Sequence, residues 1–150
     1  MPMPRHLAFA AQTLAYEAHG EQVDKAGEPY FGHLARVARR VAEQRPDRPD
    51  LIAVAWLHDL VEDTRLTIGH LANWGYPAPV VELVHALTHV RNEPRADYVA
   101  RIRAAGPGAV LVKLADIADN SDPARLAVLP EGDRARLETK YARDRAALLL

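Results

Sequence analysis

The sequence predicts an all-α protein, a bundle of about seven to nine helices. Apolar residues recur every three to four positions through almost the whole chain, which is the spacing of helices with one buried face. No alternation of apolar and polar residues is long enough to indicate a strand. With 150 residues, 49% of them hydrophobic and 26% charged, the chain has the size and balance of one globular domain. We therefore expect a single domain over residues 1–150.

Three helices are expected in the first sixty residues. The first, about 8–18, places apolar side chains on one face, at positions 7, 11, 14, 15 and 18. The second has its apolar stripe at positions 34, 37 and 41 and ends near Pro46, because the residue before a proline disfavours helical backbone. Asp50 can cap the third, which is apolar nearly all round from Leu51 to Leu57. Such a helix is typical of the middle of a bundle.

The remaining helices follow from turn and capping residues. Thr67 can cap a short helix that ends near Gly75, and the prolines at 77 and 79 open another that reaches Leu87. A turn at 91–94 precedes a helix of about 95–104, which Gly106-Pro107-Gly108 closes. Val110 to Val112 have strand propensity, but the alanines around them favour a helix through Ala118. The last helix, about 133–149, presents Leu137, Tyr141 and Leu148 inward.

Composition narrows the classes of partner and compartment. The net charge is −1, so no overall field favours nucleic acid or an anionic membrane. Cysteine is absent, which excludes disulfides, thiolate catalysis and Cys-ligated zinc. The opening MPMPRH lacks the apolar core of a signal peptide, and no apolar run approaches a membrane span. We expect a cytoplasmic protein with no nucleic-acid or membrane partner; the sequence carries no sign of its oligomeric state.

A His-Asp doublet is the most informative feature of the chain. His58 and Asp59 end the apolar run LIAVAWL, and Glu62 and Asp63 follow within one helical turn. If the helix continues, His58 shares a face with Glu62 and Asp59 shares one with Asp63. Burying such groups without partners costs several kcal/mol, by order of magnitude, and a bound metal ion removes that cost. The alternative is a helix end that turns polar as it reaches solvent.

Two distant residues have matching chemistry. His33 follows the turn EPYFG, and Asp116 interrupts an apolar stretch read as VLVKLADIA. A lone histidine or aspartate at such places is more often satisfied by hydrogen bonds or an ion pair. Together, His33, His58, Asp59 and Asp116 form a set of two imidazoles and two carboxylates. That set suits one divalent ion, with Mn²⁺, Fe²⁺, Zn²⁺ and Mg²⁺ all admissible and positions left for water and substrate oxygens.

The order H…HD…D on helices resembles the HD-domain metal-dependent phosphohydrolases. The runs AHGEQVDKAGEPYFGH, WLHDLVEDT and VKLADIADN resemble the (p)ppGpp hydrolase domain of RelA/SpoT proteins and the small stand-alone SpoT homologues. HDxxEDT is specific to that branch, and the similarity runs from about Phe9 to Tyr141. The resemblance implies an HD-type helical bundle, Mn²⁺ as the expected ion and removal of the 3′-pyrophosphate from (p)ppGpp. The synthetase and regulatory domains of the long RelA/SpoT proteins have no counterpart in these 150 residues.

The resemblance also implies roles for individual residues. Glu62 and Asp63 match catalytic positions that orient the attacking water and shuttle protons. Lys25 and Asn120 match substrate contacts, Thr88 and Arg91 fall in a segment where the family carries further contacts, and Tyr141 roughly matches an aromatic that stacks on guanine. Read without the family, Glu62 and Asp63 are a solvated helix end, Asn120 is a helix cap and Tyr141 is a core residue.

The chain departs from the family at the substrate side. Asp24 stands where the family commonly has an arginine that packs on guanine, and Ser121 and Asp122 replace a leucine and an arginine. Each change removes a favourable contact with a tetra-anionic nucleotide, so we expect weaker (p)ppGpp binding that Asp24→Arg should strengthen. Two alternatives follow: hydrolysis of another nucleotide or phosphoester, such as a deoxynucleotide or NADPH, or a non-catalytic metal and nucleotide sensor. Glu62 and Asp63 argue against the sensor, because a binder needs no water activation.

Overall fold

The computed structural model describes residues 6–150, so the first five residues of MPMPRH lie outside the described part. Within residues 6–150 the chain is all-α, as the sequence predicts, with eight helices of six residues or more and two single turns of helix. The helices are α1 (Leu7–His19), α2 (Tyr30–Gln44), α3 (Pro49–Leu57), α4 (Leu60–Asp63), α5 (Ile68–Asn73), α6 (Ala78–Leu87), α7 (Arg95–Ala104), α8 (Pro107–Asn120), α9 (Pro123–Leu126) and α10 (Glu131–Leu148). None of the described helices is both long and apolar enough to cross a membrane.

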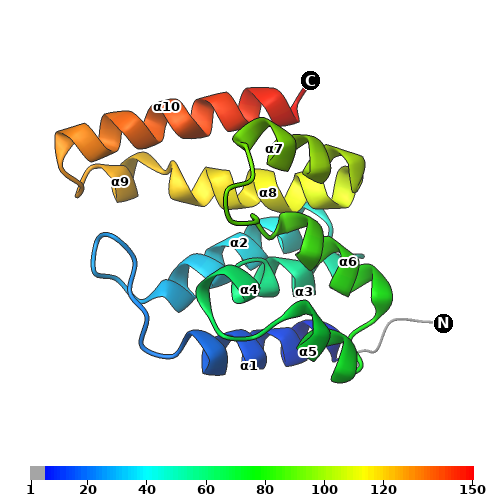
Figure 1. Ribbon diagram of the computed structural model, residues 1–150. Coiled ribbons are helices and arrows are strands. Elements are labelled where there is room, and N and C mark those ends of the chain that lie inside the picture. The colour runs from blue at the N-terminus through cyan, green and yellow to red at the C-terminus, as the bar shows by residue number, and fades with distance from the viewer. Residues whose placement is uncertain (1–5) are drawn as a thin grey trace.

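Helix α3 lies in the middle of the bundle, as its all-round apolar sequence predicts. It contacts α1, α2, α6 and α8, and its Ala53, Val54 and Leu57 are fully buried. Figure 1 shows α7, α8 and α10 packed as one layer over the body formed by the first six helices. Helix α8 joins the two parts, because it contacts α2, α3 and α6 on one side and α7 and α10 on the other.

One detail agrees with the sequence-based expectation, and one differs from it. The segment around Val110–Val112 is helical throughout, which settles the choice left open by its strand propensity. The helix through the His-Asp doublet does not continue: α3 ends at Leu57, and α4 begins at Leu60. His58 keeps helical angles, but Asp59 has φ −103° and ψ 3°, which turns the chain.

The long loop between α1 and α2 covers residues 20–29 and precedes the turn that opens α2. It folds back on itself through an isolated bridge between Val23 and Pro29 and a backbone hydrogen bond from Asp24 to Glu28 of 2.8 Å. In Figure 1 this loop and α9 lie at the same end of the molecule. Both contribute to the cleft described next.

Candidate metal centre and substrate cleft

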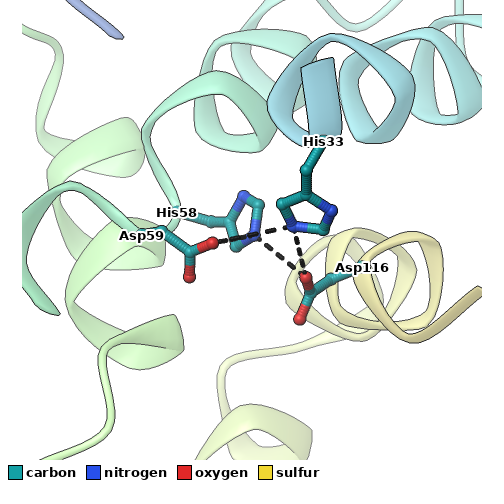
Figure 2. A group of neighbouring side chains, drawn as sticks. All are labelled: His33, His58, Asp59 and Asp116. Atoms are coloured by element: carbon teal, nitrogen blue, oxygen red, sulfur yellow. Dashed lines mark hydrogen bonds and ion pairs between the residues drawn. The ribbon is translucent and has the colours of Figure 1, made fainter. Parts of the chain in front are cut away.

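Three separate segments bring the four predicted ligands together, as Figure 2 shows. His33 comes from the first turns of α2, His58 and Asp59 from the turn between α3 and α4, and Asp116 from α8. One ligand atom from each residue lies within 4.8 Å of all the others. Nε2 of His33 lies 3.0 Å from Oδ1 of Asp116, and Nε2 of His58 lies 3.2 Å from the same oxygen. A single ion can therefore contact all four side chains.

The break between α3 and α4 lets consecutive residues serve one site. On a regular helix, neighbouring side chains diverge by about 100°. At the turn, the side chains of His58 and Asp59 instead point to the same site, and Oδ2 of Asp59 lies 3.0 Å from Nε2 of His58. The predicted i to i+4 alignment of the doublet with Glu62 and Asp63 on one continuous helix is therefore wrong, although α4 still carries both acids at the site.

Both imidazoles are oriented by hydrogen bonds on their outer nitrogens. Nδ1 of His33 donates to Oδ2 of Asp119 at 2.6 Å, and Nδ1 of His58 donates to the carbonyl of Ala55 at 2.6 Å. A ring that donates through Nδ1 has its lone pair on Nε2 when neutral, and both Nε2 atoms point into the cluster. Nε2 of His33 is buried without a hydrogen-bond partner. This orphaned nitrogen beside two carboxylates fits a divalent cation.

The electrostatics of the cluster also call for a cation. Burial would lower the pKa of His33, but the carboxylates of Asp116, Asp119 and Asp59 raise it to about 10. Without a metal, these carboxylates therefore favour the protonated form of the His33 imidazole. A divalent ion can take the place of those protons, which makes metal binding pH-dependent.

Two contributors to the cluster lie within the sequence motifs, but the sequence analysis assigned them no role. Asp119 is 1% exposed and binds His33, and Nε of Arg36 donates to its Oδ1 at 2.7 Å. These donors lower the pKa of Asp119 to about 2, against the effect of its burial, so it stays ionised. The hydroxyl of Tyr30 donates to Oδ2 of Asp59. A second acid three residues after Asp116 in an apolar helix was the available signal for Asp119.

Glu62 and Asp63 lie at the edge of the cluster and line an adjoining cleft. Burial raises the pKa of Glu62, although a hydrogen bond from the backbone N–H of His89 opposes the rise. Burial and the charge of Asp59 raise the pKa of Asp63. A carboxylate with a raised pKa is a better proton acceptor near neutral pH, which suits general-base work.

The cleft has a volume of about 460 Å³, in the range of small-molecule sites. Its lining extends from Asp59 and Asp116 of the metal cluster to residues of α10, and it includes cationic and aromatic side chains as well as the acids. The cationic lining residues are Lys25, Arg95, Lys113, Arg125 and Lys140, and the tyrosines are Tyr30, Tyr98 and Tyr141. A mixed wall of this kind suits a phosphorylated compound with a flat ring.

The predicted substrate contacts divide into two groups. Lys25, Asn120 and Tyr141 line the cleft, and the side-chain amide of Asn120 also donates to Oδ1 of Asp116 at 3.0 Å. Thr88 and Arg91 do not line it. The Thr88 hydroxyl is buried and donates to the carbonyl of Val84 at 2.8 Å, so it serves the end of α6.

Arg91 is exposed in the turn before α7, and Arg95 on the first turn of α7 reaches the cleft in its place. The segment that the sequence pattern indicated therefore reaches the cleft through Arg95 and not through Thr88 or Arg91. Nζ of Lys113 lies 2.9 Å from Oδ2 of Asp116, so this lysine contacts a predicted metal ligand.

Comparisons with known proteins agree with this geometry. The chain matches the HD domain family over residues 11–120. It is 37% identical over 117 residues to the guanosine-3′,5′-bis(diphosphate) 3′-pyrophosphohydrolase of Aquifex aeolicus (strain VF5), covering 73% of this chain and 16% of that protein. The protein of the same name from Vibrio cholerae serotype O1 (strain ATCC 39315 / El Tor Inaba N16961) is 36% identical over 119 residues, with 72% and 16% covered. The chain thus spans about a sixth of the length of these relatives.

A solved structure described as a metazoan ortholog of SpoT that hydrolyzes ppGpp has the same fold. It superposes with a TM-score of 0.69 over 99% of this chain and 94% of that chain, at 21% sequence identity. The match over residues 11–120 includes the three segments that carry the four residues of the cluster. The protein is therefore a member of the HD domain family.

Proposed function

We propose that the protein is a metal-dependent phosphohydrolase that removes the 3′-pyrophosphate from (p)ppGpp or a closely related nucleotide. The observation that carries the proposal is the continuity of the four-residue cluster with a cleft that is also lined by cationic and aromatic side chains. The names of the relatives support the same reaction. Reaction with water converts ppGpp to GDP and pyrophosphate, with the 3′ P–O bond breaking.

The metal we propose is one divalent ion, Mn²⁺, held by His33, His58, Asp59 and Asp116. When bound, such an ion supplies Lewis acidity and lowers the pKa of water. Glu62 and Asp63 accept a proton from the attacking water and pass it to the leaving oxygen. Their raised pKa values favour this exchange near neutral pH.

The cations of the cleft bind and orient the phosphates. Lys113 is nearly buried beside the cluster, and Lys25 and Lys140 stand on the loop and on α10. Burial lowers the pKa of Lys140, and the charges of Arg95 and Lys113 add to that effect. An anionic ligand relieves this repulsion between like charges, which favours a polyphosphorylated substrate. Asn120 and Tyr141 are the proposed contacts for the sugar and the base.

The second candidate is hydrolysis of another phosphate compound by the same machinery. The observation that favours it is Asp24, whose side chain cannot pack on guanine as an arginine does. The reaction class is unchanged, because the cluster and the two acids of α4 do not involve position 24.

The test is a substrate panel with the purified chain and added Mn²⁺. The panel contains ppGpp, pppGpp, NADPH and deoxynucleoside triphosphates, with chromatography of the nucleotide product and an assay for pyrophosphate or phosphate. We expect GDP and pyrophosphate in equal amounts from ppGpp, and no reaction from the Asp59→Ala variant. Cleavage of another compound alone would establish the second candidate, and no cleavage of any compound would overturn the proposal.

A further inference from the structure

One guanidinium connects the substrate side of the cleft with the metal cluster. Arg125 lies on α9, and its two terminal nitrogens point to different partners. Nη2 donates to Oδ2 of Asp24 on the loop at 2.8 Å. Nη1 donates to Oδ2 of Asp119 on α8 at 2.7 Å and lies 3.3 Å from Oδ1 of Asn120. The side chain is 24% exposed, so these contacts are partly shielded from solvent.

The loop partner of Arg125 organises the loop itself. Oδ1 of Asp24 accepts from the backbone N–H of Ala26 at 2.9 Å and from that of Glu28 at 3.0 Å. The Asp24 side chain is 8% exposed, and the hydrogen bond from Arg125 helps to lower its pKa against the effect of burial. One carboxylate thus closes the turn around Lys25 and pairs with Arg125. Asp24 is therefore not an unpaired charge facing the substrate.

The helix partner of Arg125 orients a metal ligand. Oδ2 of Asp119 accepts from Nη1 of Arg125 and also from Nδ1 of His33. Asn120, the next residue, lies between Arg125 and Asp116. A hydrogen-bonded path therefore runs from the turn that carries Lys25, through Arg125 and Asp119, to His33.

We propose that Arg125 is a positioning residue that couples the Lys25 loop to the metal cluster. It supplies from α9 the cation that holds the loop against α8, and it fixes the Asp119 carboxylate that orients His33. The acid at position 24 and the arginine at position 125 form one unit, so neither can be exchanged alone. The kinetic measurement rests on the proposed hydrolysis and the Mn²⁺ measurement on the proposed metal, whereas the hydrogen-exchange measurement rests on neither.

The first arm measures structure and metal binding without any substrate. In Arg125→Ala we expect the amides of Ala26 and Glu28 to exchange hydrogen about fivefold faster, since the bond that anchors their acceptor is lost. We expect Mn²⁺ affinity, followed by electron paramagnetic resonance, to fall about three- to tenfold. That is less than the ten- to hundredfold typical for loss of a partner that bonds a metal ligand directly, because Arg36 still holds Asp119.

Asp24→Asn separates the two connections. The amide oxygen of asparagine can still accept from the two loop amides, but the charge pair with Arg125 is lost. We expect Mn²⁺ affinity to stay within twofold of wild type, while KM rises with kcat unchanged. Arg125→Lys should fall between wild type and Arg125→Ala in both measurements, because one ammonium lacks the fork that reaches both acids.

The matched control is Arg48→Ala, which breaks an Arg–Asp pair of similar geometry with Asp50, away from the cleft. The inference is overturned if Arg125→Ala keeps both Mn²⁺ affinity and loop exchange within twofold of wild type, or if Arg48→Ala shifts them equally. If Arg125→Ala does not fold, Arg125→Lys carries the same comparison. If wild type binds no Mn²⁺, the metal assignment fails, and the exchange measurement still tests the loop connection.

The coupling reverses an expectation drawn from the sequence. An arginine at position 24, which the family pattern favours, would face Arg125 and would remove the acceptor of two loop amides. We therefore expect Asp24→Arg to raise KM for ppGpp rather than lower it. A lower KM in that variant would show that the pair does not organise the loop.

Discussion

His33 and His58 each direct Nε2 into the cluster, because a hydrogen bond on Nδ1 fixes the orientation of the ring. The outer partners are a carboxylate for His33 and a backbone carbonyl for His58. This arrangement fixes ring orientation before any ion binds, which reduces the entropy lost on binding. Replacing one of the four proposed ligands would remove a donor from the cluster, whereas replacing Glu62 or Asp63 would leave the cluster whole.

That difference gives a prediction. His58→Ala and Asp59→Ala should lose both bound Mn²⁺ and turnover, whereas Glu62→Gln and Asp63→Asn should keep the metal and slow turnover by ~10²–10⁴-fold. Metal content by mass spectrometry and kcat on the best substrate of the panel measure the two effects. Full turnover in both Glu62→Gln and Asp63→Asn would show that neither acid moves the proton.

The pH profile tests the same two acids. Burial raises the pKa of Glu62 and of Asp63, so each binds a proton at a higher pH than an exposed acid does. A general base acts as the carboxylate, and kcat should therefore fall as pH drops through the raised pKa. Glu62→Gln should shift or abolish this acidic limb, while the exposed control Glu43→Gln should leave it in place. If the acidic limb of the pH profile is the same in Glu62→Gln as in wild type, the limb belongs to a group other than Glu62.

At the residue level, the sequence was enough to identify the titratable residues that lie in apolar segments. His33, the His-Asp doublet and Asp116 stood out because titratable groups are rare in apolar segments, and the structure brings all four together. Asp119 and Arg125 were missed because their roles depend on how closely α2, α8 and the loop approach one another. Such distances are a property of packing, which a single sequence does not encode locally.

At the level of helices, periodicity and capping residues predicted most of the elements. Thr67 caps α5 as expected, and Pro107 lies in the first turn of α8. The break at Asp59 was not predictable, because neither glycine nor proline marks it. It arises from the tertiary environment, in which Asp59 accepts from Tyr30 and lies against His58.

The end of α6 depends on a side chain from another helix. Arg101 on α7 donates to the carbonyls of His85, Ala86 and Thr88 at 2.7–3.0 Å and pairs with Glu93 at 2.8 Å. A guanidinium at a helix C-terminus satisfies free carbonyls and complements the helix dipole.

We expect Arg101→Ala to lower the free energy of unfolding by about 1.5–3 kcal/mol, the range for hydrogen bonds to a charged group. Urea denaturation followed by circular dichroism measures it. Arg103→Ala is the control, because Arg103 is exposed on the same helix, and it should change stability by less than about 0.5 kcal/mol. Equal effects of the two variants would mean that Arg101 does not cap α6.

For the whole molecule, an ion bound at the proposed metal site would act as a cross-link. Its ligands come from α2, from the turn before α4 and from α8, segments separated by up to 83 positions in sequence, from His33 to Asp116. An ion that binds only the folded chain stabilises it by mass action, by about 2.7 kcal/mol at a concentration one hundred times its Kd.

At that Mn²⁺ concentration we expect Tm to rise by about 5–10 °C for a domain of this size. Scanning calorimetry with Mn²⁺ and with EDTA measures the difference. His58→Ala should show no shift with Mn²⁺, and a shift of the same size in that variant would place the ion elsewhere.

The position of α10 has a consequence for how substrate preference can change. This helix contacts α7 and α8, contributes Leu137, Lys140 and Tyr141 to the cleft and supplies none of the four residues of the cluster. The cleft is thus lined both by a helix without cluster residues and by α8, which carries Asp116 together with Lys113 and Asn120. We expect substitutions in α10 to change which phosphate compound binds while the four residues of the cluster stay in place. For the same reason α10, rather than α8, is the segment to exchange between relatives when ligand selectivity is to be altered.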